Sequence, residues 1–248
     1  TEFTLNESTI QGKLTVSNLD SDDTVTAYDS HVFKGASISN GTGDATVTFK
    51  GVYMRQDGAK VYPLKIISGS NGWGYETDTV SVFLDEVDAS TLTVSAPQES
   101  HFILKDVNTT AGPLSVVTGS RNDTLFFGNI DAKGAISIRT GAGDDTLTFT
   151  EHNRPQGVLS IDTGAGNDSV NLDTGTGEGF SNYYGKVKVT LGTGDDQMWV
   201  GNGGLNGNKG HYYKAVTFDG GAGTDSIVYL ANGNVFDVQP VILFENKL

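Results

Sequence analysis

The chain has 248 residues, no cysteine and a formal net charge of −14, from 30 acidic and 16 basic residues. The lack of cysteine excludes disulfides and thiolate metal sites, and the acidic balance argues against nucleic acid, whose phosphates repel such a surface. No apolar run approaches the roughly 18 residues of a membrane-spanning helix. The 33 glycines against 5 prolines indicate many short strands joined by turns.

Pairs of apolar residues, with one residue between the two members, recur nine times along the chain. The pairs are Leu14/Val16, Ala36/Ile38, Leu64/Ile66, Leu92/Val94, Leu114/Val116, Ile136/Ile138, Leu159/Ile161, Val187/Val189 and Val216/Phe218. The residue between them is polar or small. This alternation predicts nine strands, each with one buried face.

A turn follows each pair, and a second alternating strand follows the turn. Its inward candidates are Val25/Ala27, Val47/Phe49, Val80/Val82, Leu125/Phe127, Leu147/Phe149, Val170/Leu172, Met198/Val200 and Ile227/Tyr229. The fourth segment is irregular, and Phe102/Leu104 fit best if its turn is one residue short. Each unit then closes through a variable loop. Successive units are about 22 to 29 residues long, a period at which each unit buries its apolar face only by stacking on its neighbours.

We therefore expect an all-β chain, folded as a right-handed parallel β-helix (β-solenoid) of about nine coils. No linker or charge block interrupts the pattern, so residues 1–248 are expected to form a single domain. The apolar segment 232–248 leaves the repeat and is interpreted as a C-terminal cap or terminal strand, because an open solenoid end exposes strand edges.

Turns of the form Gly-x-Gly-x-Asp separate the two strands in the later coils. They occupy residues 140–145 (TGAGDD), 163–168 (TGAGND), 191–196 (LGTGDD) and 220–225 (GGAGTD). Their paired glycines are Gly141 and Gly143, Gly164 and Gly166, Gly192 and Gly194, and Gly221 and Gly223. Glycine adopts positive φ at little cost, so these turns are expected along one edge of the solenoid.

The stretch 220–228 (GGAGTDSIV) resembles the G-G-x-G-x-D-x-U-x nonapeptide of RTX-type calcium-binding β-rolls in secreted and cell-surface bacterial proteins. The resemblance implies Ca²⁺ between stacked turns, held by backbone carbonyls at the glycines and by the carboxylate at the sixth turn position. Carried over by position, it assigns the metal-ligand role to Asp123, Asp145, Asp168, Asp196 and Asp225. At the first of these turns Arg121 replaces the second glycine.

Turn chemistry alone is the alternative explanation, since Asp and Asn favour such turns through side-chain hydrogen bonds to the backbone. Carboxylates stacked about 5 Å apart repel by roughly 0.8 kcal/mol in water and about 3 kcal/mol at an effective dielectric constant near 20, and a bridging cation reverses that sign. The first four coils depart from the motif: Ala45, for example, stands where the carboxylate is expected. The resemblance therefore covers the architecture of the whole chain and the site chemistry of about its second half.

The expected function is that of a non-enzymatic, calcium-binding structural or adhesive solenoid of a secreted or cell-surface protein. Thr1 is read as the start of a mature chain or of a piece of a longer one. The first alternative is a β-helix that binds or degrades polysaccharide; the second is a metal-free structural solenoid.

Aromatic loops in the seventh and eighth coils carry the candidate ligand-binding residues Tyr183, Tyr184, Tyr212 and Tyr213. Such rings beside polar loops suit carbohydrate or another surface protein, but we favour the interpretation that they cover one long edge of the core. No catalytic residue is assigned, because the four histidines fall in different coils. The acidic trio Asp85, Glu86 and Asp88 is typical of a solvated surface.

Overall fold

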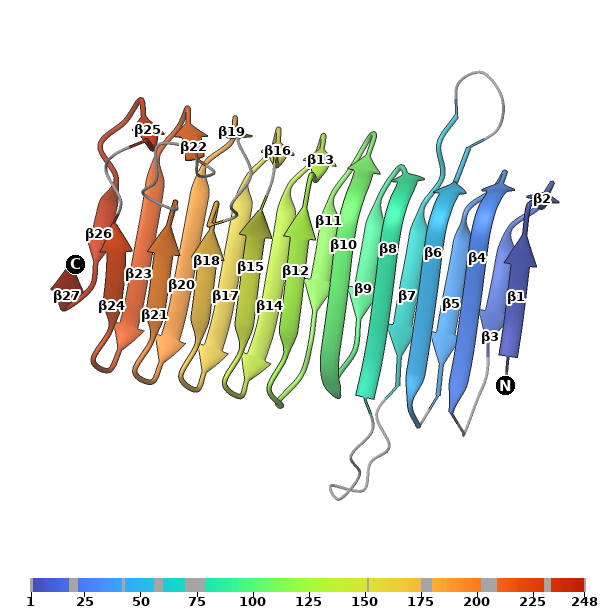
Figure 1. Ribbon diagram of the computed structural model, residues 1–248, viewed down its shortest axis with the longest axis horizontal. Coiled ribbons are helices and arrows are strands. Elements are labelled where there is room, and N and C mark those ends of the chain that lie inside the picture. Colours follow the sequence, from blue (N-terminus) through green and yellow to red (C-terminus); the bar gives the residue numbers. More distant parts are fainter. Residues whose placement is uncertain are drawn as a thin grey trace.

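The computed structural model describes residues 2–17, 22–41, 43–55, 60–69, 79–150, 152–174, 180–201, 209–229 and 233–247. Within these ranges the chain forms strands, named β1 to β27, and no helix. All pairings between these strands are parallel. The strands wind into a rod (Figure 1). The fold is therefore all-β and a parallel β-helix, as the alternation predicts. None of the described segments forms a helix long and apolar enough to cross a bilayer.

The first sheet has ten strands and contains the nine predicted apolar pairs. In spatial order its strands are β3 (Leu14–Ser17), β5 (Ala36–Asn40), β7 (Leu64–Ser68), β9 (Leu92–Ser95), β11 (Leu114–Val117), β14 (Ile136–Ala142), β17 (Leu159–Ala165), β20 (Val187–Thr193), β23 (Val216–Ala222) and β26 (Val241–Leu243). Leu14 pairs with Ala36, Ala36 with Leu64, and this column continues without offset to Val216. All members of the nine pairs are buried except Val16, which is partly buried.

The second sheet has fourteen strands and contains the second set of apolar pairs. Its main path is β1 (Glu2–Asn6), β4 (Asp23–Val32), β6 (Ala45–Tyr53), β8 (Thr79–Ala89), β10 (Glu99–Thr109), β12 (Thr124–Gly128), β15 (Thr146–Thr150), β18 (Ser169–Leu172), β21 (Gln197–Val200), β24 (Ser226–Tyr229) and β27 (Asn246–Lys247), with β2 (Thr9–Ile10), β13 (Asp131–Ala132) and β16 (Arg154–Pro155) beside it.

One predicted pair in this sheet is out of register. Val82 and Leu84, rather than Val80 and Val82, pair with Val47 and Phe49. Val80 instead pairs with Ala45, next to the turn, and is also buried. The third turn is longer in sequence than the others. Alternation in the sequence shows which residues face inward, but it does not show which of them pairs with Val47 in the preceding coil.

The long strands of the early coils bend at a single residue with left-handed backbone. Asp29 has φ 44°, Glu86 φ 55° and Asp106 φ 52°, and Gly51 occupies the same column with φ 62°. At this corner the alternation shifts phase by one residue: in β8 the buried positions are 80, 82 and 84 and then 87 and 89. The part of each unit that the sequence suggests is a loop therefore begins as a strand on a third face.

The third face is completed in the late coils by β19 (Phe180–Tyr183), β22 (Lys209–Tyr212) and β25 (Val235–Phe236). Inside it the rings of Tyr183, Tyr212 and Phe236 stack at centroid distances of 4.6 Å each. The last strands β25, β26 and β27 pair with β22, β23 and β24, so residues 233–247 add a layer to all three faces.

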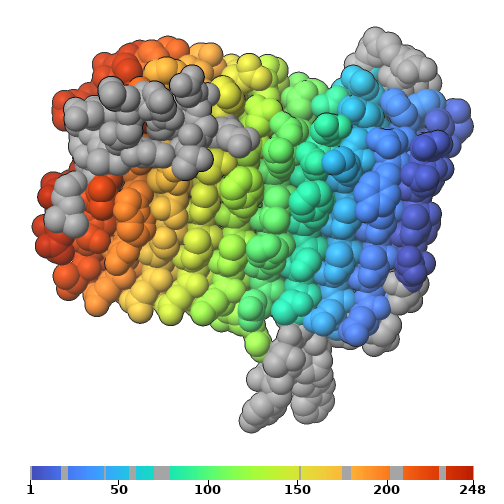
Figure 2. Space-filling view, in the orientation of Figure 1, coloured from blue at the N-terminus to red at the C-terminus, as the bar shows by residue number. Residues whose placement is uncertain are grey.

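One hydrophobic core runs along the rod, from Leu14 to Phe244. Figure 2 shows the sequence colours as ordered bands across the molecule, so that each coil packs chiefly on its neighbours. This is the nearest-neighbour stacking that a solenoid requires.

Candidate metal site in the stacked turns

The Gly-x-Gly-x-Asp turns stack along one edge of the rod, the lower edge in Figure 1. Gly164 has φ +106°, and a Cβ placed there would lie 1.8 Å from the carbonyl oxygen of Gly141. The coils approach too closely for any side chain, so glycine is required both by its conformational freedom and by space. The predicted pairs form two such columns, Gly141, Gly164, Gly192 and Gly221, and Gly143, Gly166, Gly194 and Gly223, all with positive φ.

The sixth turn position forms a column of buried carboxylates. Each of its five aspartates is at most 1% exposed: Asp123, Asp145, Asp168, Asp196 and Asp225. Asp145 Oδ1 accepts the backbone N–H of Asp123 at 2.8 Å, and Asp168 Oδ1 accepts that of Asp145 at 2.9 Å. The same bond recurs from Asp168 to Asp196 at 2.7 Å and from Asp196 to Asp225 at 3.0 Å. Each carboxylate therefore fastens its coil to the preceding one.

Both ends of this carboxylate ladder are closed. At the N-terminal end Ser100 donates its backbone N–H to Asp123 Oδ1 at 2.7 Å. At the C-terminal end Asp225 donates its own N–H to Glu245 Oε2 at 3.1 Å. Glu245 lies in the segment that the sequence suggested as a cap, and its carboxylate takes the place of a sixth-position aspartate.

The second carboxylate oxygen distinguishes four of the five aspartates. Oδ2 of Asp145, Asp168, Asp196 and Asp225 is buried and makes no hydrogen bond of ordinary geometry within the described part of the chain. The hydroxyls of Thr140 and Thr163 lie close enough to Asp145 and Asp168 to lower the pKa of these carboxyls, but burial outweighs that effect. Asp123 differs, because its Oδ2 accepts the hydroxyl of Thr118. The Thr118 hydroxyl also lies 3.0 Å from the Thr140 carbonyl, and the equivalent hydroxyls of Thr140 and Thr163 donate to the carbonyls of Thr163, at 3.1 Å, and Leu191, at 2.7 Å.

Burial makes these carboxylates costly to charge. Desolvation raises the pKa of Asp123 to about 7, and the neighbouring charge of Asp145 adds to the effect. Burial likewise raises the pKa of Asp145 and of Asp196 to about 6, and raises the pKa of Asp168 and Asp225. Near neutral pH the ladder is therefore stabilised by whatever neutralises it, either a proton or a cation.

A second ladder runs along the exposed fifth turn position, in the opposite direction. Asn122 Oδ1 accepts the N–H of Asp144 at 2.8 Å, and Asp144 Oδ1 accepts the N–H of Asn167 at 2.7 Å. Asn167 and Asp195 continue it to Thr224 at 2.8 and 2.9 Å. Amide and carboxylate alternate, which keeps the charges two coils apart. Sequence reasoning missed this ladder, although the Asn–Asp alternation was a visible signal.

The early coils interrupt the buried column. In the early coils the position of the sixth-position aspartate is occupied by Asp23, Ala45, Val80 and Ser100, which pair in that order. Ser100 lies in the coil next to that of Asp123. Three successive coils therefore lack the carboxylate, so the continuous run is confined to coils five to nine, as the sequence motif indicates.

The donor set suits a hard cation. In the described ranges no three Asp, Glu or His side chains converge as a metal-binding group. An ion between two coils would therefore take at most two carboxylates, with the remaining ligands from glycine carbonyls. The Gly164 carbonyl oxygen lies 1.9 Å from the Cβ position of Gly192, directed at the next coil. An all-oxygen set of this kind fits Ca²⁺.

The aromatic candidates divide into buried and surface rings. Tyr183 and Tyr212 are completely buried, and their hydroxyls donate to Asp173 Oδ1 at 3.1 Å and Oδ2 at 3.2 Å. Desolvation raises the pKa of Asp173 to about 6. Burial removes Tyr183 and Tyr212 from the candidates for ligand contact, because these rings form the core under the third face.

Tyr184 is exposed and Tyr213 is half-buried, and their rings stack on each other with centroids 4.9 Å apart. Tyr213 also stacks on His211 at 3.8 Å. Stacking covers ring faces that a sugar would otherwise contact. This arrangement favours the interpretation that they cover an edge of the solenoid.

The acidic trio is engaged in surface ion pairs. Asp85 lies 3.2 Å from the Lys50 ammonium and Asp88 lies 3.5 Å from the Arg55 guanidinium. These contacts account for two of the three carboxylates without a reacting group.

No protein-family model, curated protein or solved structure matches this chain. The site is therefore interpreted from its own geometry.

Proposed function

We propose that the chain is a non-enzymatic structural or adhesive β-solenoid of a secreted or cell-surface protein, whose later coils bind Ca²⁺ in the stacked turns. One observation carries the proposal: the four buried Oδ2 atoms of Asp145, Asp168, Asp196 and Asp225, which make no hydrogen bond of ordinary geometry among the described residues. Buried polar atoms are nearly always partnered in native structures, and the recurrence of this exception in four successive coils supports a ligand at the column.

Calcium would supply the neutralising charge of the carboxylate ladder. Because the ligands come from neighbouring coils, they are assembled only in the folded chain, and binding energy becomes folding energy. An acidic chain of net charge −14 is then expanded where calcium is scarce and folded where calcium is millimolar. The extended rod suits a stalk, spacer or adhesive segment.

The metal-free alternative also has support, because every Oδ1 of the ladder already accepts a backbone N–H. The two functions differ in what the charge does. In the metal-free solenoid the charge only destabilises, whereas in the calcium solenoid it is required for binding.

Replacing Asp168 by asparagine separates them. Its carboxamide oxygen retains the bond to the Asp145 N–H, while the charge is lost. In EDTA we expect the variant to unfold at the same temperature as the wild type or higher, because repulsion is relieved. In millimolar calcium we expect it to unfold at a lower temperature than the wild type.

The matched control is Asp162→Asn, on the exposed face of β17, with magnesium as the control cation. The control variant should follow the wild type in both buffers. A wild-type melting temperature that calcium leaves unchanged would contradict the proposal and leave turn chemistry as the explanation.

A further inference from the structure

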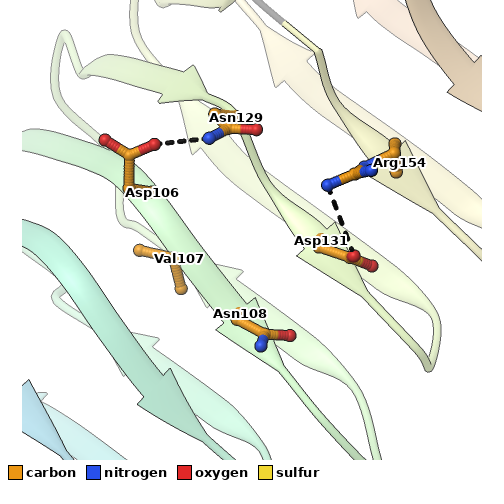
Figure 3. A pocket seen from close by; sticks show the side chains of 6 residues that line it. All are labelled: Asp106, Val107, Asn108, Asn129, Asp131 and Arg154. Atoms are coloured by element: carbon orange, nitrogen blue, oxygen red, sulfur yellow. Dashed lines mark hydrogen bonds and ion pairs between the residues drawn. The ribbon is translucent and has the colours of Figure 1, made fainter.

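A small depression lies on the outer surface where the second sheet bends into the third face. Its volume is about 190 Å³, and it is lined by Asp106, Val107, Asn108, Asn129, Asp131 and Arg154. These residues come from three successive coils, through β10, the β12–β13 corner and β16 (Figure 3). The turns of the proposed calcium site lie on a different edge of the rod, so the depression has no part in that function.

The depression gathers both donors and acceptors of hydrogen bonds. The Asn129 carboxamide donates to Asp106 Oδ1, and the Arg154 guanidinium lies 3.7 Å from Asp131 Oδ2. Lys133 adds a second cation 3.6 Å from Asp131 Oδ1. Planar carboxylates, carboxamides and a guanidinium pair well with neighbouring hydroxyl groups, because each offers two polar atoms at fixed spacing.

An aromatic ring lies next to Gly128, the chain neighbour of the lining residue Asn129. Phe126 is half-buried on the outer face of β12, and its ring lies across Gly128, the residue before Asn129. A Cβ at Gly128 would lie 3.1 Å from Phe126 Cε1. Glycine therefore allows the ring to lie over residue 128, which pairs with Lys105 of the preceding coil.

The charges limit the ligand class. Asp131 faces two cations, so the cluster carries no large excess of either sign. The chain as a whole carries −14 and repels polyanions at long range. The volume is below the roughly 300–1,000 Å³ of pockets that enclose a drug-sized molecule, and it suits one unit of a larger ligand lying across the surface.

We infer that this depression binds a neutral sugar unit of a glycan, with Asn108, Asn129 and Arg154 contacting hydroxyls and Phe126 packing against the apolar face of the ring. Contact with one or two units yields weak binding, with a Kd of about 1 mM. A solenoid that presents such a site on a rigid rod would hold its parent protein to a glycan surface.

The test is NMR titration of the ¹⁵N-labelled full chain in calcium buffer with a panel of neutral oligosaccharides: α- and β-linked glucose, mannose, galactose and N-acetylglucosamine. A galacturonate oligomer is the acidic arm. We expect the side-chain amide signals of Asn108 and Asn129 to shift with at least one neutral member.

Asn108→Ala and Phe126→Leu should each weaken that binding about fivefold. Tyr28→Leu, an exposed aromatic on the same sheet, and Arg139→Gln, an exposed arginine on the first sheet, are matched controls and should bind as the wild type does. Circular dichroism verifies that each variant is folded. If Phe126→Leu does not fold, the result for Asn108→Ala decides the test. The inference is overturned by an absence of shifts across the neutral panel, by binding of galacturonate alone, or by neutral-sugar binding that neither pocket variant weakens.

Discussion

Acidification should stabilise this protein in the absence of metal, contrary to the usual acid denaturation. The folded-state pKa values of the ladder lie above the ordinary aspartate value, so the folded chain binds protons more tightly than the unfolded chain does. This stabilising contribution is complete below about pH 4, the unfolded pKa, and is lost as the pH rises through the folded values of about 6 to 7.

The magnitude follows from the individual carboxylates. Raising the pKa of Asp145 from 3.8 to about 6 corresponds to about 3 kcal/mol in favour of the protonated form. Neighbours in the ladder share this field and do not add fully, so we take about 4 kcal/mol for the ladder between pH 8 and pH 5. In a chain of this size each kcal/mol moves the melting temperature by roughly 2–4 °C, so a rise of roughly 10 °C is expected.

Circular dichroism melts in EDTA at pH 5, 6, 7 and 8 measure the effect. The double variant Asp145→Asn with Asp168→Asn should show a smaller pH dependence, because two of the titrating groups are gone. Calcium should raise stability most at pH 8, where protons no longer compete for the carboxylates. A wild-type melting temperature that falls steadily from pH 8 to pH 5 in EDTA, in parallel with the double variant, would refute the reasoning.

Two further predictions concern the turns. Gly164→Ala should destabilise the chain by more than about 3 kcal/mol, because positive φ costs roughly 1–2 kcal/mol and the added Cβ meets a backbone carbonyl of the preceding coil. Gly12→Ala is the control and should be neutral, because nothing lies within 4 Å of its Cβ position. Similar denaturant midpoints for the two variants would contradict the packing. Asn167→Asp would place three carboxylates in consecutive positions of the exposed ladder. We expect it to lower the free energy of unfolding by about 1 kcal/mol at low salt and to have no effect at high salt. A destabilisation that does not depend on salt would point to geometry instead of charge.

The alternation in the sequence determined the stacking of coils and the edge that carries the turns. A pair such as Leu159 and Ile161 can bury its face only against equivalent pairs in neighbouring coils, so the repeat itself dictates the register of the first sheet. The buried carboxylate column follows from the same register, since equal spacing from each pair brings Asp145 and Asp168 into adjacent layers.

The tertiary structure alone decided what happens where that spacing is lost. At corner residues such as Glu86 and Asp106 one left-handed residue shifts the phase of the alternation, so the third face is invisible to a search for period two. The hydroxyls of the buried rings of Tyr183 and Tyr212 are satisfied by Asp173, which lies 10 residues before Tyr183 and 39 residues before Tyr212 in the sequence.

The depression likewise depends on groups from three coils: Asp106, Asn129 and Arg154 are more than 20 residues apart in sequence from one to the next. Local patterns in a sequence encode which face of a strand is apolar, because that depends on neighbouring residues. Convergence of polar side chains depends on the path of the backbone between distant positions, and only the folded coil sets that path.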